Sequence, residues 1–283
     1  MSEDTKSHTA FSRVIAALDV SCHDQQTLAT AAEIAARLGL DLAALFIEDE
    51  NLFRAAALPV ARHVVAGSSA AASLDVEQLT TEMRALAALS ESELRSTAAR
   101  HGVKSSFRVV RGLPAAEVAT ETKTEDLLIV GAARAFADLP LSLNSPMREA
   151  IWRVGCSILQ MRQPAPTRRP LLVLQAGSAL TQRAVGAATR LASAASSRLE
   201  MILVGSPSDS ARAAAKIEAA LAEQGRDAGL RYTTSISAAQ VIRAASEGAN
   251  DMLILVSDLP ELRNETELGE VMTAAPCAVL LVR

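Results

Sequence analysis

The sequence predicts an α/β protein made of two tandem domains, each an open five-stranded, mostly parallel sheet with helices on both faces. Short apolar runs alternate with segments of helical periodicity along the chain, which is the pattern of strand–helix–strand units. Two segments also recur in the same order: Asp126 begins DLLIV and Asp251 begins DMLIL, and Cys156 returns as Cys277. The offsets of 125 residues (251 minus 126) and 121 residues (277 minus 156) indicate a duplicated domain rather than a short repeat.

The elements of the first domain follow in order. Residues 14–18 are an apolar run that ends at Asp19, as a buried parallel strand does, and a helical pattern follows with Gly39 at its carboxyl end. The same alternation predicts further strands at 41–47, 106–111, 126–130 and 157–161, and helices at 78–100, 114–122 and 146–153. Residues 1–162 form the first predicted domain.

A linker at residues 163–170 follows, because three prolines in eight residues resist both helix and sheet. The second predicted domain, residues 171–283, repeats the order of the first. Its expected strands are 171–174, 199–204, 231–236, 252–256 and 278–282, and its expected helices are 182–195, 210–224, 239–247 and 265–273.

The first domain is longer than the second between its first and fourth strands, and we place the extra residues at 48–74. A connection of this length is usually a lid, a binding loop or a partner surface. A disordered insertion is the alternative. Leu52, Phe53, Leu58 and Val60 make the segment apolar, so we expect an ordered excursion.

Composition argues against several classes of function. A net charge of −4 and 2% aromatic residues provide neither the basic face nor the stacking platforms of nucleic-acid-binding proteins. No run of 18 apolar residues and no apolar signal core at residues 1–10 is present, so we expect no membrane segment. The three cysteines form no C-x-x-C motif, which suits a cytoplasmic protein, and Cys156 and Cys277 are predicted to be buried and unreactive.

Catalytic and metal-binding patterns are absent from the sequence. The four histidines show no metal-ligand spacing, and neither a G-x-S-x-G elbow nor a Walker A sequence occurs. Cys22 and His23 are adjacent in a loop, but adjacency does not make a nucleophile face its base. We therefore predict neither an enzyme nor a metal site.

The residues after the first and fourth strands resemble those of the universal stress protein family in its tandem two-domain form. Asp19 occupies the acidic position, and Gly131, Arg134, Asn144 and Ser145 occupy the spacing of the family's G-x2-G-x9-G-[S/T] motif. The resemblance covers roughly residues 12–162 and 169–283. It implies the strand order 3-2-1-4-5 and binding of ATP or AMP at Asp19, Ile47, Val130, Gly131, Arg134, Asn144 and Ser145.

Two of the three motif glycines are replaced in the first domain. Glycines let backbone N–H groups approach phosphate oxygens closely. Arg134 adds bulk but also a bidentate phosphate donor, and Asn144 tolerates a left-handed conformation. Two interpretations stay open: an altered, weak nucleotide pocket in which Arg134 clamps phosphate, or a decayed loop that carries a surface arginine.

The second domain has lost the motif. Ala176 takes the place of Asp19, Val256 that of Gly131, and Thr266 that of Ser145. The helix start there is surrounded by acidic residues, Glu261, Glu265, Glu267 and Glu270. Carboxylates stabilise a helix N-terminus but repel a phosphate. We predict a structural second domain that binds no nucleotide.

Two functions remain from the sequence, with a slow ATPase as a weaker third. One is a cytoplasmic, nucleotide-responsive stress regulator. The alternative is a non-nucleotide interaction protein that uses residues 48–74 to bind an unknown protein partner or a small apolar ligand. The terminal strands at 157–161 and 278–282 would be bare edges, so we expect them to pair into a pseudo-dimer, as the resemblance also implies. A homodimer is compatible with the resemblance, and neither nucleic acid nor membrane is an expected partner.

Overall fold

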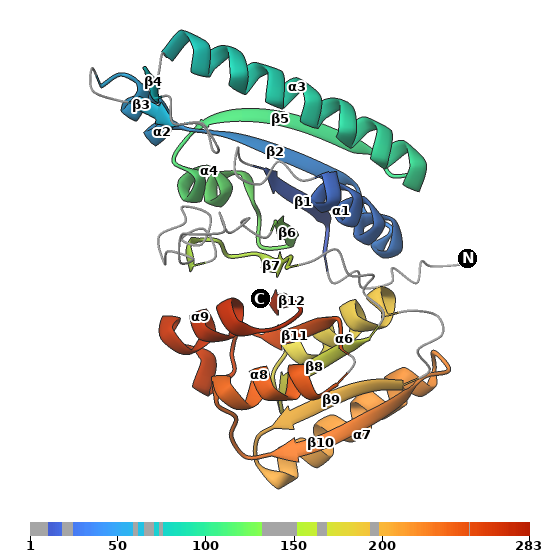
Figure 1. Ribbon diagram of the computed structural model, residues 1–283. Coiled ribbons are helices and arrows are strands. Elements are labelled where there is room, and N and C mark those ends of the chain that lie inside the picture. Colours follow the sequence, from blue (N-terminus) through green and yellow to red (C-terminus); the bar gives the residue numbers. More distant parts are fainter. Residues whose placement is uncertain are drawn as a thin grey trace.

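The computed structural model describes residues 11–18, 25–58, 62–64, 71–73, 76–131, 152–162, 169–192, 198–248 and 250–283, with only the backbone described at 62–64 and 71–73. Each half supplies five strands to one sheet (Figure 1). The first half contributes β1 (Arg13–Leu18), β2 (Leu42–Asp49), β5 (Ser105–Gly112), β6 (Asp126–Val130) and β7 (Ser157–Gln160). The second half contributes β8 (Pro170–Gln175), β9 (Arg198–Val204), β10 (Asp227–Thr233), β11 (Met252–Val256) and β12 (Ala278–Val282).

The strands lie in the order β10-β9-β8-β11-β12-β7-β6-β1-β2-β5. Counted within each half, this is the order 3-2-1-4-5, so the predicted α/β class and strand order are confirmed. The central strands form because they are continuous aliphatic runs that can be buried on both faces. Every side chain of β6, β11 and β12 is buried.

Helices cover both faces of the sheet (Figure 1). In the first half, α1 (Gln25–Leu38) and α3 (Val76–His101) pack together over one face, and α4 (Pro114–Glu121) packs on β2 and β5. In the second half, α6 (Leu180–Leu191) covers β8, and α7 (Pro207–Ala222) covers β9 and β10. Helices α8 (Ala238–Glu247) and α9 (Glu265–Ala274) pack on each other, with the short 3-10 helix η2 (Pro260–Leu262) beside α9. Among the helices of the described chain, none combines the length and apolarity that crossing a membrane requires.

The two halves join through their terminal strands, as the sequence predicts. Strand β7 pairs with β12, with Leu159 opposite Leu280. This pairing is antiparallel, whereas the neighbouring pairs β6–β7 and β11–β12 are parallel. A twofold relation between two copies requires that the strands of one half run opposite to those of the other, so that the strands at the junction are antiparallel. The chain is therefore an internal pseudo-dimer with one continuous sheet.

Arginines of each half reach across this junction to backbone carbonyls of the other. Arg37, near the end of α1, donates to the carbonyl of Leu191 at 2.7 Å, and Arg190, near the end of α6, donates to the carbonyl of Leu38 at 3.1 Å. Each guanidinium thus caps the carboxyl end of the opposite helix, where carbonyls lack helical partners and the dipole favours a cation.

A second pair of arginines repeats the exchange at the ends of the terminal strands. Arg162 follows β7 and donates to the carbonyl of Met272 in α9 at 3.3 Å. Arg283 follows β12 and donates to the carbonyl of Val154 in the first half. The reciprocal contacts extend the pseudo-twofold junction beyond the two strands.

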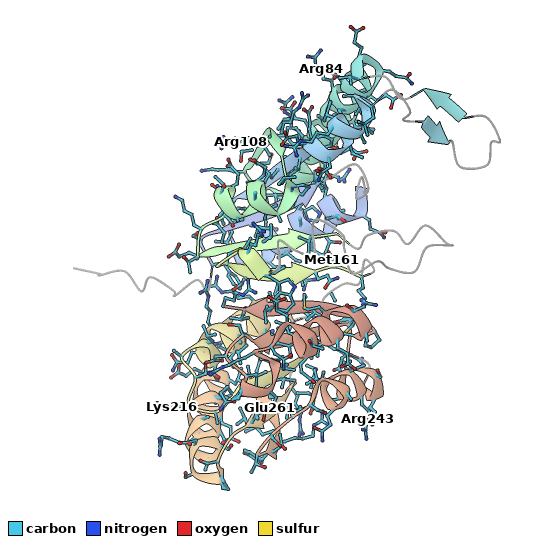
Figure 2. The ribbon with its side chains drawn as sticks, turned by 90° about the vertical axis from the view of Figure 1, so that its left-hand side faces the viewer. Arg84, Arg108, Met161, Lys216, Arg243 and Glu261 are labelled. Carbon is cyan, nitrogen blue, oxygen red and sulfur yellow. The ribbon has the colours of Figure 1, made fainter. Side chains whose placement is uncertain are left out.

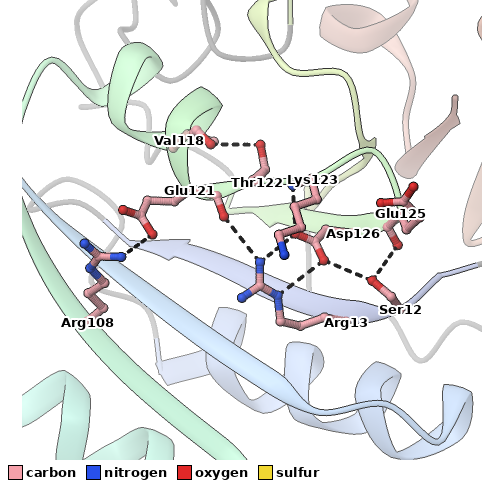
Figure 3. Close-up of polar contacts among 9 residues, drawn as sticks. All are labelled: Ser12, Arg13, Arg108, Val118, Glu121, Thr122, Lys123, Glu125 and Asp126. Carbon is pink, nitrogen blue, oxygen red and sulfur yellow. Dashed lines mark hydrogen bonds and ion pairs between the residues drawn. The ribbon is translucent and has the colours of Figure 1, made fainter.

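The acid that starts the fourth strand holds the first strand in both halves. In the first half, Asp126 is buried and accepts from Arg13 Nη2 at 2.7 Å, from Ser12 Oγ at 3.2 Å and from the Lys123 amide at 2.9 Å (Figure 3). Burial opposes ionisation of this carboxyl, but the bonds from Arg13, Lys123 and Ser12 outweigh it and lower its pKa. In the second half, Asp251 accepts from the Arg169 amide at 3.0 Å.

Expected boundaries are wrong at strands β2 and β10, and also at helices α6 and α7, which begin before the expected residues 182 and 210 and end before the expected residues 195 and 224. Strand β2 extends to Asp49, because Glu48 and Asp49 pair with Arg111 and Gly112 of β5, so the excursion begins after the strand. Strand β10 spans Asp227–Thr233 instead of 231–236, because Ser237 caps α8 and takes the preceding residues out of the sheet. The helix expected at 146–153 lies outside the described residues except for residues 152–153.

Candidate functional site

The candidate nucleotide site lies where the strand order reverses. In the first half β1 has β2 on one side and β6 on the other, and in open α/β sheets the carboxyl ends of the strands at such a reversal are the usual place of ligand binding. Ala17 pairs with Val130 and Leu18 with Phe46, which places Val130, Gly131 and Ile47 at this end of three adjacent strands. The family resemblance had named all three as candidate nucleotide-binding residues.

The other four predicted site residues, Asp19, Arg134, Asn144 and Ser145, lie outside the described residues. Of the three that are described, Ile47 and Val130 are buried, while Gly131 is half-buried at the point where β6 leaves the sheet. The described part of the site is thus an apolar floor of Ile47 and Val130, with a half-buried glycine at the end of β6.

A polar cluster lies beside this floor at the carboxyl ends of β2 and β5. Glu48, buried at 7% exposure, accepts from Arg111 Nη2 at 2.7 Å and Nε at 2.8 Å. The Arg111 guanidinium also stacks 3.9 Å from the ring centroid of Phe53 on α2 (Glu50–Ala56). A paired and stacked arginine holds α2 against the sheet. Arg111 therefore anchors the first part of the excursion, and its charge is already compensated.

The excursion itself contains further regular structure. After α2, β3 (Arg62–Val64) and β4 (Ala71–Ser73) form an antiparallel two-stranded sheet separate from the main one. Figure 1 shows α2, β3 and β4 together at the end of the first half, beside the start of α3. Leu52 and Leu58 are exposed at 39% and 57%.

The equivalent place in the second half is closed. Ile129 and Ile254 are equivalent in the repeat and pair with Ala16 and Leu172, so the register puts Gln175, rather than Ala176, at the position of Asp19. Whether Gln175 or Ala176 is aligned with Asp19, the second half has no acidic residue at this position. At the position of Gly131, Val256 still belongs to strand β11 and is fully buried.

The loop after β11 fills the remaining space with its own side chains. Leu259 and Leu262 are exposed at 0% and 2%. Asn264 Oδ1 accepts the Glu267 amide at 2.7 Å, so the start of α9 is capped from within the chain. Two acidic residues occupy the first turn of that helix, Glu265 and Glu267. A phosphate would meet buried leucines, an occupied amide and negative charge there.

The described cysteines are buried, as predicted, and unsuited to nucleophilic chemistry. Both Cys156 and Cys277 are free thiols just before the terminal strands. Burial raises the pKa of Cys156 and raises that of Cys277 to about 11. Since the thiolate is the reactive form, both thiols stay protonated at neutral pH. No group of three or more metal-ligating side chains occurs within the described ranges.

The exchanged arginines escaped sequence reasoning, although a signal was present. Ala-x-Arg-Leu occurs at residues 35–38 and again at 188–191, and Arg162 and Arg283 follow the terminal strands at the same 121-residue offset as Cys156 and Cys277. An arginine that is repeated at the end of equivalent elements, in two copies whose sequences have otherwise diverged, could have indicated a contact between the copies.

Comparison with known proteins agrees with this fold. No protein-family model matches the sequence, and no curated protein matches it. A universal stress protein from Archaeoglobus fulgidus is similar with a TM-score of 0.68 at 14% identity, over 97% of this chain and 97% of its own. A Pseudomonas aeruginosa protein of unknown function is similar with a TM-score of 0.57 at 15% identity, over 97% and 93%. The cytoplasmic domain of a prokaryotic cation chloride cotransporter gives 0.50 at 11% identity, over 96% and 95%.

The chain thus belongs structurally to the open-sheet α/β proteins in which the strand order reverses within the sheet. Over nearly its whole length it has the universal stress protein fold. At these identities the likeness concerns the fold, so the function has to be argued from the chain's own residues.

Proposed function

We propose that this protein is a cytoplasmic stress regulator whose first half binds ATP or AMP weakly and whose second half is its structural partner. The asymmetry between the two strand-order reversals carries the proposal. In the first half β6 ends before Gly131, which stays half-buried above an apolar floor, whereas the second half is filled by Val256, Leu259 and Leu262. A site retained in one copy and closed in the other suits one nucleotide per chain.

The roles within this proposal follow from the chemistry of the predicted residues. Gly131 lets a phosphate approach the backbone, Asp19 accepts from a ribose or adenine donor, and Arg134 grips the phosphate as a bidentate cation. Ser145 and Asn144 flank the phosphate, and Ile47 and Val130 lie beneath the base. No catalytic residue and no metal is assigned. Free buried thiols among the described residues suit a reducing cytoplasm.

The test is calorimetric titration of the full chain with ATP and with AMP. We expect weak binding by the wild type, and about tenfold weaker binding by Arg134→Ala, because one charge-assisted contact contributes roughly 1.5–3 kcal/mol. Arg84→Ala is the matched control: Arg84 is exposed on α3, far from the strand-order reversal (Figure 2). Unchanged binding in Arg134→Ala would refute the clamp, and an inert wild type would refute nucleotide binding.

The same titration tests the second half without dividing the chain. If the second half binds no nucleotide, a variant with Asp19→Ala and Arg134→Ala should lose ATP binding completely. A residual site with one-to-one stoichiometry in this variant would contradict the structural role of the second half.

A second candidate function is a protein-interaction module, and the excursion favours it. Leu52 and Leu58 are exposed on and after α2, which contacts α3, and Val76 at the start of α3 is itself 37% exposed. The fold also occurs as the cytoplasmic domain of a cation chloride cotransporter, so it does not by itself imply a nucleotide. Leu52→Asp with Leu58→Asp should abolish partner binding while leaving any nucleotide affinity unchanged.

A further inference from the structure

An arginine and a glutamate recur at equivalent positions on the third strand and the following helix of each half. Leu45 pairs with Arg108, and Ile202 pairs with Arg231, so the sheet register makes the two arginines equivalent. Each following helix ends in a glutamate, Glu121 in α4 and Glu247 in α8. The outer ends of the sheet thus carry the same two charges.

The pair is closed in the first half and open in the second. Arg108 Nη1 lies 2.6 Å from Glu121 Oε2, as the dashed line in Figure 3 shows. In the second half, Arg231 and Glu247 line a groove of 290 Å³ instead. Throughout the part of the chain that the structure describes, neither the Arg231 side chain nor the Glu247 side chain has a hydrogen bond or an ion pair.

The groove exists because α8 is placed differently from α4. Helix α4 packs directly on β2 and β5, whereas α8 packs mainly on α9. The face that α8 turns to the groove is formed by Gln240, Arg243, Ala244 and Glu247. Helix α8 buries a different stripe, which consists of Ala238, Val241 and Ala245. The face toward the groove is therefore the mostly polar face of the helix, and core packing does not fill the space.

The lining of the groove is chemically suited to an anion. Arg231 from β10 and Arg243 from α8 supply two guanidinium groups, and Arg243 projects from the outer surface of the second half (Figure 2). Ile202 and Ala244 supply an apolar floor. The amide oxygen of Gln240 is taken by the Ser237 amide at 2.8 Å, which leaves its NH₂ group as a further donor.

We propose that this groove binds a small organic anion, a carboxylate or a phosphate monoester with a compact apolar part. Arg231 and Arg243 grip the anionic group through their planar forks, and the apolar part lies on Ile202 and Ala244. The ligand's charge takes the place that Glu121 holds opposite Arg108 in the first half. The volume of 290 Å³ lies at the small end of ligand pockets, which suits a compact ligand. The site is separate from the proposed nucleotide site.

The chain contains its own probe for this site, because Tyr232 is its one tyrosine and follows Arg231 directly. Labelling with [¹⁵N]tyrosine gives a single amide resonance from the full chain. We expect this resonance to shift saturably on titration with inorganic phosphate, phenyl phosphate and benzoate at constant ionic strength. Phenyl phosphate should bind more tightly than inorganic phosphate if the apolar floor takes part. Comparison of benzoate with phenyl phosphate identifies the preferred anionic group.

Variants make the test specific. Arg231→Gln and Arg243→Gln should each weaken binding about tenfold. Arg212→Gln, an equal loss of charge on α7, should leave it unchanged, because Arg212 pairs with Asp209 away from the groove. Glu247→Gln should tighten binding by removing a repelling carboxylate, a gain that misfolding cannot imitate. A non-saturating shift in the wild type, or equal affinity in Arg231→Gln and Arg212→Gln, would overturn the proposal.

Discussion

The ion pair between Arg13 and Asp126 should be a major source of stability in the first half. The Asp126 side chain is 2% exposed and is bound by Arg13, Ser12 and the Lys123 amide. The change Asp126→Asn keeps the shape but removes the charge and at least one acceptor. Hydrogen bonds to charged groups contribute roughly 1.5–3 kcal/mol, and Arg13 is itself 37% exposed, which screens the pair. We expect a loss of about 2–3 kcal/mol in the free energy of unfolding.

The duplication supplies a matched control for this change. Asp251 is half-buried at the repeat-equivalent position and accepts from the Arg169 backbone amide. We expect Asp251→Asn to cost about 1 kcal/mol, because a neutral amide oxygen can still accept that bond. Urea unfolding followed by circular dichroism measures both variants, and the fluorescence of the chain's one tryptophan, Trp152, reports on the first half. An equal or smaller loss in Asp126→Asn would refute the reasoning.

The pH dependence gives an independent check on the same group. The pKa of Asp126 is lowered from its ordinary value of 3.8, so its contribution to stability is fully present above that value and is lost as pH falls through the lower pKa of the folded state. The difference in unfolding free energy between wild type and Asp126→Asn should be constant from neutral pH down to about pH 5. It should shrink below pH 3.8. A difference that grows on acidification would contradict the assignment.

Two other predictions concern the junction and the thiols. Arg37→Ala and Arg190→Ala should each lower the free energy of unfolding in urea by about 1–2 kcal/mol, because each removes a charge-assisted cap. Arg95→Ala, in an exposed helical pair with Glu91, should lower it by at most about 0.5 kcal/mol. Equal losses in all three variants would show that the caps stabilise the protein no more than an exposed ion pair does. In a Cys22→Ser background, Cys156 and Cys277 should resist iodoacetamide at pH 8 because burial raises the pKa of both thiols, and both should react fully in denaturant. Rapid alkylation of the native protein would contradict their burial.

The sequence predicted the middle of the sheet better than its outer ends, for a physical reason. Buried parallel strands such as β6 and β11 are continuous aliphatic runs, so their positions and their repeat are visible in the sequence. Strand β10 is an outer strand that reads DAGLRYT and is half exposed, so neither hydrophobicity nor alternation marks its start. Its limits are set by pairing with β9 and by the cap of α8, which are tertiary effects.

The residues of the candidate site also differ in how far the sequence predicts their positions. The apolar runs predicted strand ends at Ile47 and Val130, and the strand order that the resemblance implied placed these ends on either side of β1, as the register shows. The roles of Asp19 and Arg134 stay predictions. The groove beside β10 could not be predicted, since Arg108 and Glu121 carry the same charges as Arg231 and Glu247. What distinguishes the halves is the placement of α8, which periodicity does not encode.

The distribution of symmetry and asymmetry indicates where function should lie. At the junction each contact needs residues of both halves, as in the exchanged pairs Arg37–Leu191 and Arg190–Leu38, so a change in one copy disturbs a contact made by the other. The outer parts carry no such mutual constraint. There the halves differ: a half-buried Gly131 against a filled loop, an excursion on one side only, and an Arg–Glu pair that is closed at β5 and open at β10. The symmetric centre connects the two outer sites through one shared sheet. A ligand in one half can therefore influence a ligand in the other only through that sheet.

The amide resonance of Tyr232 also reports on this coupling. ATP bound near Gly131 should shift the resonance only if the sheet transmits the change.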